Sequence, residues 1–135
     1  MRALLWPHGT AEEHTKEFDL ALEHGTTGTL PMATFVSADD SGQLTGFLEA
    51  GLRSHADGCD PARPVGFIEG WFVREEFRHR GIGRDLVLAA EAWARALGCR
   101  EMASDTWIDH EGSQQAHQAL GYEVVDRCVH FRKRI

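Results

Sequence analysis

An apolar run, a short turn with two glycines and an amphipathic segment follow one another in the middle of the chain. The run Val65 to Val73 is typical of a strand, and Arg84 to Leu97 repeats apolar residues at helical spacing, ending at Gly98. A second short strand, Arg100 to Asp105, comes next. Strand, helix and strand in this order predict a right-handed crossover that joins two parallel strands. The sequence therefore predicts an α/β architecture with at least one parallel strand pair.

Alternation along the first strand divides its residues between two faces of the sheet. One predicted face carries Val65, Phe67, Glu69, Trp71 and Val73, and the other carries Gly66, Ile68, Gly70 and Phe72. The glycines indicate that something approaches the backbone closely, or that the strand contains a bulge.

The remaining segments predict further helices and strands around this unit. A capping box at residues 10–13 predicts a helix with Phe18, Ala21 and Leu22 as its apolar stripe, ending at Gly25. The other predicted elements are strands Met32–Ser37 and Gln43–Arg53, a helix Glu111–Leu120, and closing strands Tyr122–Val125 and Cys128–Lys133. Residues 54–64 form a long loop.

Composition limits the class of protein. A chain of 135 residues is expected to form a single domain, residues 1–135. A net charge of −7 argues against a nucleic-acid partner. No apolar run is long enough to cross a membrane, and the N-terminus lacks a signal-peptide layout, so we expect a cytoplasmic protein. Three cysteines without CxxC spacing, and histidines outside any HExxH motif, predict neither disulfides nor a metal site.

The segment Arg78-His79-Arg80-Gly81-Ile82-Gly83 lies between the apolar strand and the helix. Two glycines allow backbone N–H groups to converge on an anion, and the helix N-terminus adds partial positive charge. Arg78, Arg80 and Arg84 add full charges, so a diphosphate would fit. The spacing matches neither a P-loop nor a dinucleotide fingerprint. An ordinary strand-to-helix turn remains the alternative.

These residues also carry a resemblance to a known family. The arginine and glycines of this turn resemble the acetyl-CoA pyrophosphate loop of the GNAT superfamily of N-acetyltransferases, and Leu120-Gly121-Tyr122 resembles a later element of that superfamily. More closely, residues 5–7, 66–73, 98–106, 117–122 and 131–135 resemble bacterial aminoglycoside 6'-N-acetyltransferases. The resemblance covers nearly the whole chain. It implies the GNAT fold, a central mixed sheet with a splayed parallel strand pair and flanking helices, here without the family's first strand.

The resemblance implies acetyl-CoA as co-substrate, bound where the two parallel strands splay apart. Backbone groups of Trp71, Phe72 and Val73 would meet the pantetheine arm and the thioester carbonyl. The pyrophosphate would bind to the loop residues Arg78, His79, Arg80, Gly81, Ile82, Gly83 and Arg84. His110 stands where the superfamily often uses an asparagine to hold the pantetheine arm.

The implied acceptor is an aminoglycoside, which is a polycation, and the implied outcome is antibiotic resistance. Carboxylates are the expected recognition groups. We expect Glu69, Asp105 and Asp126 to bind the acceptor, with further contacts from Trp6 and His55. A structural salt bridge is the alternative for Glu69, a solvated loop position for Asp126, and core packing for Trp6.

The chemistry implied is direct attack of the amine on the thioester in a ternary complex. Glu69 or Asp105 would accept the proton that the ammonium must lose. His117 occupies the position of the tyrosine that protonates the leaving thiolate in many relatives, and Tyr122 is the other candidate acid. A surface position for His117 and core packing for Tyr122 are the alternatives.

Two other functions are compatible with these residues. The protein could be a GNAT enzyme that acetylates a polyamine or a protein amine, or a protein that binds acyl-CoA without turnover. A nucleophilic role for Cys59, Cys99 or Cys128 is a third alternative. The resemblance also implies a homodimer formed partly through the C-terminal strands, although Val129, Phe131 and Ile135 suit a core equally well.

Overall fold

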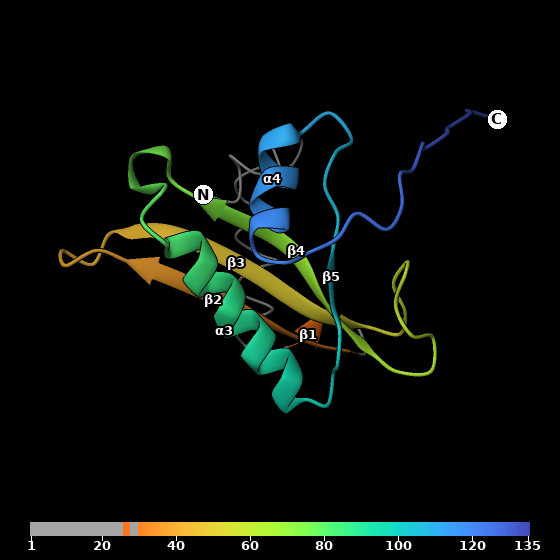
Figure 1. Ribbon diagram of the computed structural model, residues 1–135, viewed down its shortest axis with the longest axis horizontal. Coiled ribbons are helices and arrows are strands. Elements are labelled where there is room, and N and C mark those ends of the chain that lie inside the picture. Colours follow the sequence, from red (N-terminus) through yellow and green to blue (C-terminus); the bar gives the residue numbers. More distant parts are fainter. Residues whose placement is uncertain (1–25, 28–29) are drawn as a thin grey trace.

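A computed structural model describes residues 26–27 and 30–135 of the chain (Figure 1). Trp6, the predicted capping box and the helix expected to follow it lie outside the described residues. The N-terminal region, where we expected the family's first strand to be missing, also lies outside the described residues.

One mixed sheet organises the described part of the chain. Its strands are β1 (Thr26–Thr27), β2 (Leu30–Ala38), β3 (Leu44–Arg53), β4 (Val65–Val73) and β5 (Met102–Ser104), which lie side by side in that order. Strands β1 to β4 pair with one another in antiparallel fashion, and β4 pairs with β5 in parallel. The parallel pair predicted from the sequence is confirmed, and the mixed sheet with it.

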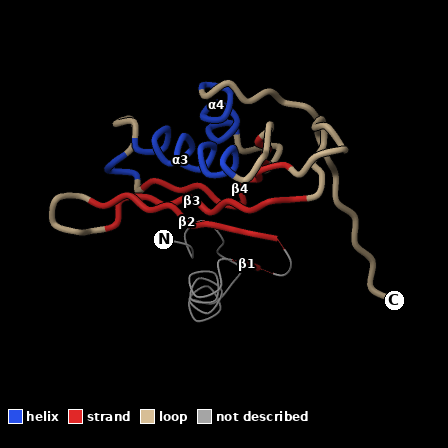
Figure 2. The backbone as a smooth tube through the Cα atoms, turned by 90° about the horizontal axis from the view of Figure 1, so that it is seen from below, coloured by secondary structure: helices blue, strands red, loops and turns tan. Residues whose placement is uncertain are grey.

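Helices α3 (Ile82–Ala96) and α4 (Glu111–Ala119) lie on the same face of this sheet (Figure 2). A short 3₁₀ turn, Glu75–Phe77, separates β4 from α3. Helix α3 is followed by its C-cap Leu97 and then by Gly98, which has φ of +92° and donates its amide to the Arg95 carbonyl. Among the helices described, none is both long and apolar enough to span a membrane.

The hydrophobic core lies between the sheet and α3. Its buried cluster consists of Leu48, Ala50 and Ile68 from the sheet and Leu86, Val87 and Ala90 from the helix. These helix positions recur at the spacing of one helical face, which is why this stripe is buried. Phe35 of β2 meets Trp93 of α3 edge to face, with ring centroids 6.3 Å apart. The core therefore fixes α3 against β2, β3 and β4.

A β-bulge at Glu69 changes the predicted alternation of β4. Ile68 pairs with Ala50 and Gly70 pairs with Glu49, so Glu69 has no partner of its own on β3. Beyond it, Trp71 and Val73 pack against the same core as Ile68, whereas Phe72 meets Phe47 at 6.2 Å. The predicted faces are therefore wrong from Trp71 onward, because one extra residue shifts every later side chain to the opposite face.

The predicted closing strands are absent. Residues 122–135 form neither helix nor strand, and the end of this segment extends away from the body of the protein (Figure 2). Val129 and Phe131 are 71% and 92% exposed. The alternating pattern indicates an extended backbone, but a strand also needs a neighbouring strand to bond with. Within the described chain, no strand pairs with this segment.

Gly66 confirms the close approach expected from the glycines of β4. A Cβ atom at this position would lie 2.5 Å from Met102 Sδ on β5 and 2.8 Å from the Cβ of Ala94 on α3. The absence of a side chain therefore allows helix, parallel strand and β4 to meet.

We predict that Gly66→Ala lowers the free energy of unfolding by about 1–3 kcal/mol, because the added methyl overpacks this junction. Gly112→Ala is the matched control. It adds the same methyl within α4, where nothing lies within 4 Å, and should raise stability by about 0.5–1 kcal/mol. Chemical denaturation of both variants measures the difference. Equal stabilities would contradict the packing of this junction.

Candidate active site

The parallel strands β4 and β5 separate after only three residue pairs. Pairing runs from Gly66 opposite Met102 to Ile68 opposite Ser104 and stops where the Glu69 bulge begins. From there β4 continues to Val73 with one edge unpaired by any described strand. Strand separation therefore opens a gap at the C-terminal ends of the parallel pair, the position where α/β sheets bind ligands.

The open edge of β4 presents backbone donors. The Arg74 amide bonds to the Thr45 carbonyl on β3 at 2.8 Å. Because successive residues of a strand direct their backbone groups to opposite edges, the amides of Val73 and Trp71 point to the open edge. Two backbone N–H groups are therefore available to a ligand in the gap.

The turn before α3 has the geometry of an anion site. Gly81 is the N-cap residue with φ of +85°, and no described side chain caps the helix. The Asp85 amide is the first to bond back to the Gly81 carbonyl, at 3.0 Å, so the amides of Ile82, Gly83 and Arg84 are free of intrahelical bonds. His79, with φ of +62°, also occupies the left-handed region. The turn presents a helix N-terminus to the solvent, as an anion site requires.

Gly83 has a different role from Gly81. A Cβ at Gly83 would lie 3.1 Å from Cζ2 and 3.3 Å from Nε1 of Trp71. Trp71 therefore packs directly against the first turn of α3. This contact joins the open edge of β4 to the turn before α3, residues 78–84, which we call the anion turn.

Three arginines surround the turn, and their contacts differ. Arg78 Nε donates to the Val73 carbonyl at 2.8 Å. The Arg80 guanidinium lies 5.5 Å from the centre of the Phe77 ring. Arg84 is exposed, with Nη2 3.6 Å from Asp85 Oδ1. Arg78 thus connects the turn to the end of β4.

Glu69, at the bulge, is paired in this structure. Arg53 of β3 donates to both of its carboxylate oxygens, at 3.0 and 2.8 Å. The Arg53 guanidinium also lies 3.5 Å from the centre of the Phe67 ring. The side chain of Glu69 remains 35% exposed, so it is both salt-bridged and accessible to a cation.

The other predicted acceptor contacts are more dispersed. Asp105 directly follows β5 and is exposed beside the strand separation. Asp126 lies in the extended C-terminal segment, where its Oδ1 accepts the Arg127 amide at 2.7 Å. His55 lies in the exposed loop 54–64 and contacts Ser54 Oγ at 3.0 Å. His110 is the N-cap residue of α4, and its side chain makes no capping bond.

His117 of α4 is half-buried against Trp71 of β4 and is not a surface group. Its ring meets Trp71 edge to face at 5.1 Å and Tyr122 at 5.9 Å. Nδ1 lies 2.7 Å from the Ser113 carbonyl oxygen, and Nε2 lies 2.8 Å from Ser104 Oγ. The ring is thus held on both nitrogens at the point where β4 and β5 separate.

Tyr122 and Trp71 each bury a polar atom that has no hydrogen-bond partner among the described residues: the Tyr122 hydroxyl and the Trp71 Nε1. Burial, with Glu91 as a second cause, raises the pKa of Tyr122 well above its ordinary value. Its hydroxyl therefore stays protonated near neutral pH.

Two of the three cysteines are unsuited to nucleophilic chemistry. Burial raises the pKa of the Cys59 thiol, and the neighbouring Glu101 raises it further. Burial also raises the pKa of Cys99. Because the thiolate is the reactive form, these environments suppress reactivity.

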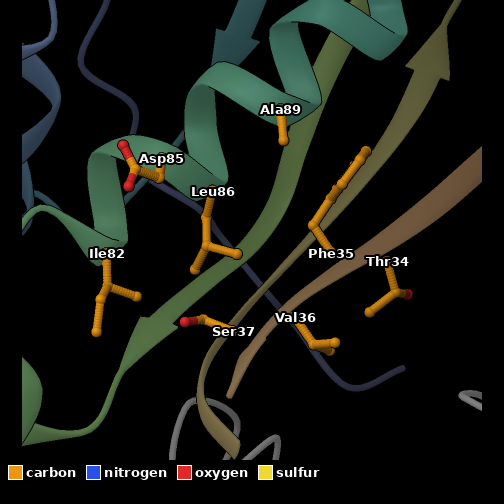
Figure 3. Close-up of a pocket in the computed structure, with 8 residues that line it drawn as sticks. All are labelled: Thr34, Phe35, Val36, Ser37, Ile82, Asp85, Leu86 and Ala89. Atoms are coloured by element: carbon orange, nitrogen blue, oxygen red, sulfur yellow. The ribbon is translucent and has the colours of Figure 1, made fainter. Parts of the chain in front are cut away.

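A separate cavity of about 440 Å³ lies between β2 and the first turns of α3 (Figure 3). Its lining residues are Thr34, Phe35, Val36, Ser37, Ile82, Asp85, Leu86 and Ala89. Of these residues, only Ile82 is among those predicted to bind acetyl-CoA. The cavity is therefore distinct from the gap between β4 and β5.

Two residues of this region are not indicated by the sequence. Arg53 reaches Glu69 across the sheet, and Ser104 reaches His117 from the end of β5. Both contacts depend on strand pairing, which no local pattern around either residue reveals. A serine at a strand end carries no signal of its own.

Together, a separating parallel strand pair, an open strand edge and a glycine turn at a helix N-terminus define a site for an acyl-CoA-dependent transferase. Comparison with known proteins gives the family. Residues 1–122 match the family model described as the acetyltransferase (GNAT) family. The chain belongs to this family, and its fold is the GNAT fold.

The similar proteins are more specific. A protein of Klebsiella aerogenes called aminoglycoside N(6')-acetyltransferase type 1 is 40% identical over 133 residues, covering 98% of this chain and 86% of the relative. A Salmonella typhimurium protein of the same name is 38% identical, covering 99% of this chain and 88% of the relative.

Solved structures agree with these sequence relatives. AAC(6')-Iy in complex with the bisubstrate analogue CoA-S-monomethyl-acetylneamine matches with a TM-score of 0.86 and 38% identity, covering 100% of this chain and 88% of that one. The aminoglycoside 6'-N-acetyltransferase AAC(6')-Ih of Acinetobacter baumannii matches with a TM-score of 0.84 and 35% identity, covering 99% and 87%.

We predict that Tyr122→Phe leaves the free energy of unfolding within about 1 kcal/mol of its starting value, or raises it, because no described partner loses a bond to the hydroxyl. Tyr122→Ala, which also removes the ring, should cost about 3–5 kcal/mol. Denaturant titration compares the two. A large loss in Tyr122→Phe would show that the hydroxyl has a partner.

Proposed function

We propose that this protein transfers the acetyl group of acetyl-CoA to the 6'-amino group of aminoglycoside antibiotics, by direct attack in a ternary complex, and thereby confers resistance. The observation that carries the proposal is the open edge of β4 beside the anion turn, in a chain that is 38% identical to an enzyme solved with a CoA–aminoglycoside analogue. We place the activity in the cytoplasm, where acetyl-CoA is available.

Acetyl-CoA would lie along the open edge of β4. The Trp71 and Val73 amides are placed to bond the pantetheine arm and the thioester carbonyl, with Phe72 between them. A backbone N–H at this edge would stabilise the oxyanion as the tetrahedral intermediate forms. The pyrophosphate would be held by the free amides and the arginines of the turn, which consists of Arg78, His79, Arg80, Gly81, Ile82, Gly83 and Arg84. His110 would contact the pantetheine arm from the start of α4.

The acceptor would approach from the acidic side of the gap. Glu69 and Asp105 flank the point where the strands separate, and either could bind an ammonium or receive its proton. The net charge of −7 favours a polycation. Arg53 already occupies both oxygens of Glu69, so an incoming ammonium shares or replaces that pairing. Trp6, His55 and Asp126 are proposed as outer contacts.

The leaving thiolate requires a proton. His117 and Tyr122 are the proposed donors on this side of the gap, and of the two only the His117 ring forms hydrogen bonds in the described structure. Burial raises the pKa of Tyr122, which makes its hydroxyl a weaker acid than an ordinary tyrosine. The geometry thus favours His117 over Tyr122 in proton transfer.

Thiol release from acetyl-CoA tests the proposal. Kanamycin A, which carries a 6'-amine, should be turned over, and paromomycin, which carries a 6'-hydroxyl there, should not. Acetylation of spermidine but not of kanamycin A would indicate a different amine substrate. Binding of acetyl-CoA with no turnover on any amine would indicate an acyl-CoA-binding protein and would contradict the proposal.

We predict that Gly81→Ala weakens binding of CoA, because a left-handed backbone at the α3 N-cap is strained for alanine and the amides shift. Gly42→Ala is the matched control, with the same φ of +85° in the turn between β2 and β3 and open space around it. Both variants should lose similar stability. Isothermal titration should show weaker CoA binding in Gly81→Ala alone. Equal affinities in the two would contradict the placement of the pyrophosphate.

We also propose a homodimer in which the C-terminal segment packs on a second copy of the chain. Val129, Phe131 and Ile135 are exposed on an extended segment that has no strand partner in the described chain. Leaving three large apolar side chains in water is unfavourable, and a second copy would cover them.

Light scattering on the full chain should give twice the chain mass. Replacing Val129 and Phe131 by serine should reduce the mass to that of a monomer, while Val36→Ser, an exposed apolar position on β2, should not. A monomeric parent protein would contradict the dimer and leave the proposed reaction untouched.

A further inference from the structure

The hydrogen bonds of His117 determine which of its nitrogens carries the proton. Nδ1 lies 2.7 Å from the Ser113 carbonyl oxygen, and a carbonyl oxygen only accepts. The Ser113 hydroxyl lies farther from Nδ1, at 3.4 Å, so the carbonyl is its nearest partner and we assign Nδ1 as the donor. In the neutral ring, Nε2 then holds a lone pair and accepts from the Ser104 hydroxyl at 2.8 Å. A neutral ring in this tautomer cannot donate a proton from Nε2, but it can receive one there.

Ser104 lies where the reaction is expected. It is the last residue of β5, and it pairs with Ile68 of β4 at the end of the parallel ladder. Its hydroxyl donates to His117, which leaves the oxygen lone pairs as acceptors. His117 in turn packs against Trp71, on the open edge of β4. The serine hydroxyl is thus bonded to the ring and belongs to the last residue of β5 that pairs with β4.

We propose, on the basis of the proposed function, that Ser104 is a catalytic residue that relays a proton between the reacting groups and His117. The acceptor ammonium first loses one proton to Glu69 or Asp105, which releases it to solvent, and the neutral amine attacks the thioester carbon. The new N–C bond leaves the nitrogen positively charged. Ser104 Oγ takes a proton from that nitrogen while passing its own proton to His117 Nε2.

The same route then returns the proton. The C–S bond breaks, and the CoA thiolate takes the proton of Ser104 while His117 Nε2 gives its proton back to the serine. One proton from the amine ends on sulfur, and the histidine is neutral again. While protonated, the ring has both N–H groups paired, with Ser113 and with Ser104. Its position in the last turn of α4 also favours a cation.

This relay resolves the apparent conflict between His117 as a donor to the thiolate and its resting bonds. The ring receives the proton before it donates it. Neither step needs the Tyr122 hydroxyl, which has no partner among the described residues.

Three substitutions test the proposal in the full-length protein. Ser104→Ala should lower kcat about tenfold or more, with KM for both substrates unchanged, since general acid–base catalysis contributes at least this much. Ser104→Thr, which keeps a hydroxyl, should recover most of the loss. Ser37→Ala is the matched control: it deletes a part-buried strand hydroxyl bonded at 3.0 Å to Thr45, outside the gap, and should keep the parent kcat.

A double-mutant cycle distinguishes a relay from two separate effects. Ser104→Ala added to His117→Gln should cause no further loss of kcat, because the route is already broken. The proposal would be overturned if the kcat of the double variant fell by the product of the two single losses. An unchanged kcat in Ser104→Ala would overturn it as well.

A readout independent of turnover keeps the two proposals separable. Nitrogen-15 NMR of the resting protein should show His117 protonated on Nδ1 and unprotonated on Nε2, and Ser104→Ala should shift the Nε2 signal. A ring protonated on Nε2 would overturn the relay even in an active enzyme. Absence of turnover in the parent protein, with the predicted tautomer present, would contradict the proposed function instead.

Discussion

The site depends on one extra residue in β4. The bulge at Glu69 ends the parallel pairing with β5 after Ile68 and turns Trp71 and Val73 toward the core that Ile68 faces. A regular strand would continue the ladder and leave no gap between β4 and β5. It would also point Trp71 away from α3. Strand separation, the open row of amides and the position of Trp71 therefore have a common cause.

Trp71 then connects the parts that the bulge creates. On one side its ring packs against Gly83 at the start of α3, and on the other it meets His117 of α4. The turn before α3 and the His117 ring thus both pack against the same residue of β4. The pairing of Glu69 with Arg53 neutralises the carboxylate of the bulge residue.

Local patterns predicted most of the fold. Helical spacing from Leu86 to Ala90 and the bounds of β4 were right, because each reflects burial of one face. The faces beyond Glu69 and the closing strands after Tyr122 were wrong, because both depend on what lies beside the strand. Motif residues such as Gly81 were recognisable from the sequence, whereas Ser104 and Arg53 were not. Their contacts are made across the sheet and to α4, between residues distant in sequence.

Hydrogen exchange with and without CoA tests the central claim most directly, since it locates the bound cofactor without requiring turnover. The account predicts that CoA slows exchange of the amides at residues 71–73, on the open edge of β4, and at residues 82–84, at the start of α3. Exchange at residues 34–37, which line the cavity beside β2, should not change. Protection at residues 34–37, with none at the edge of β4, would contradict it.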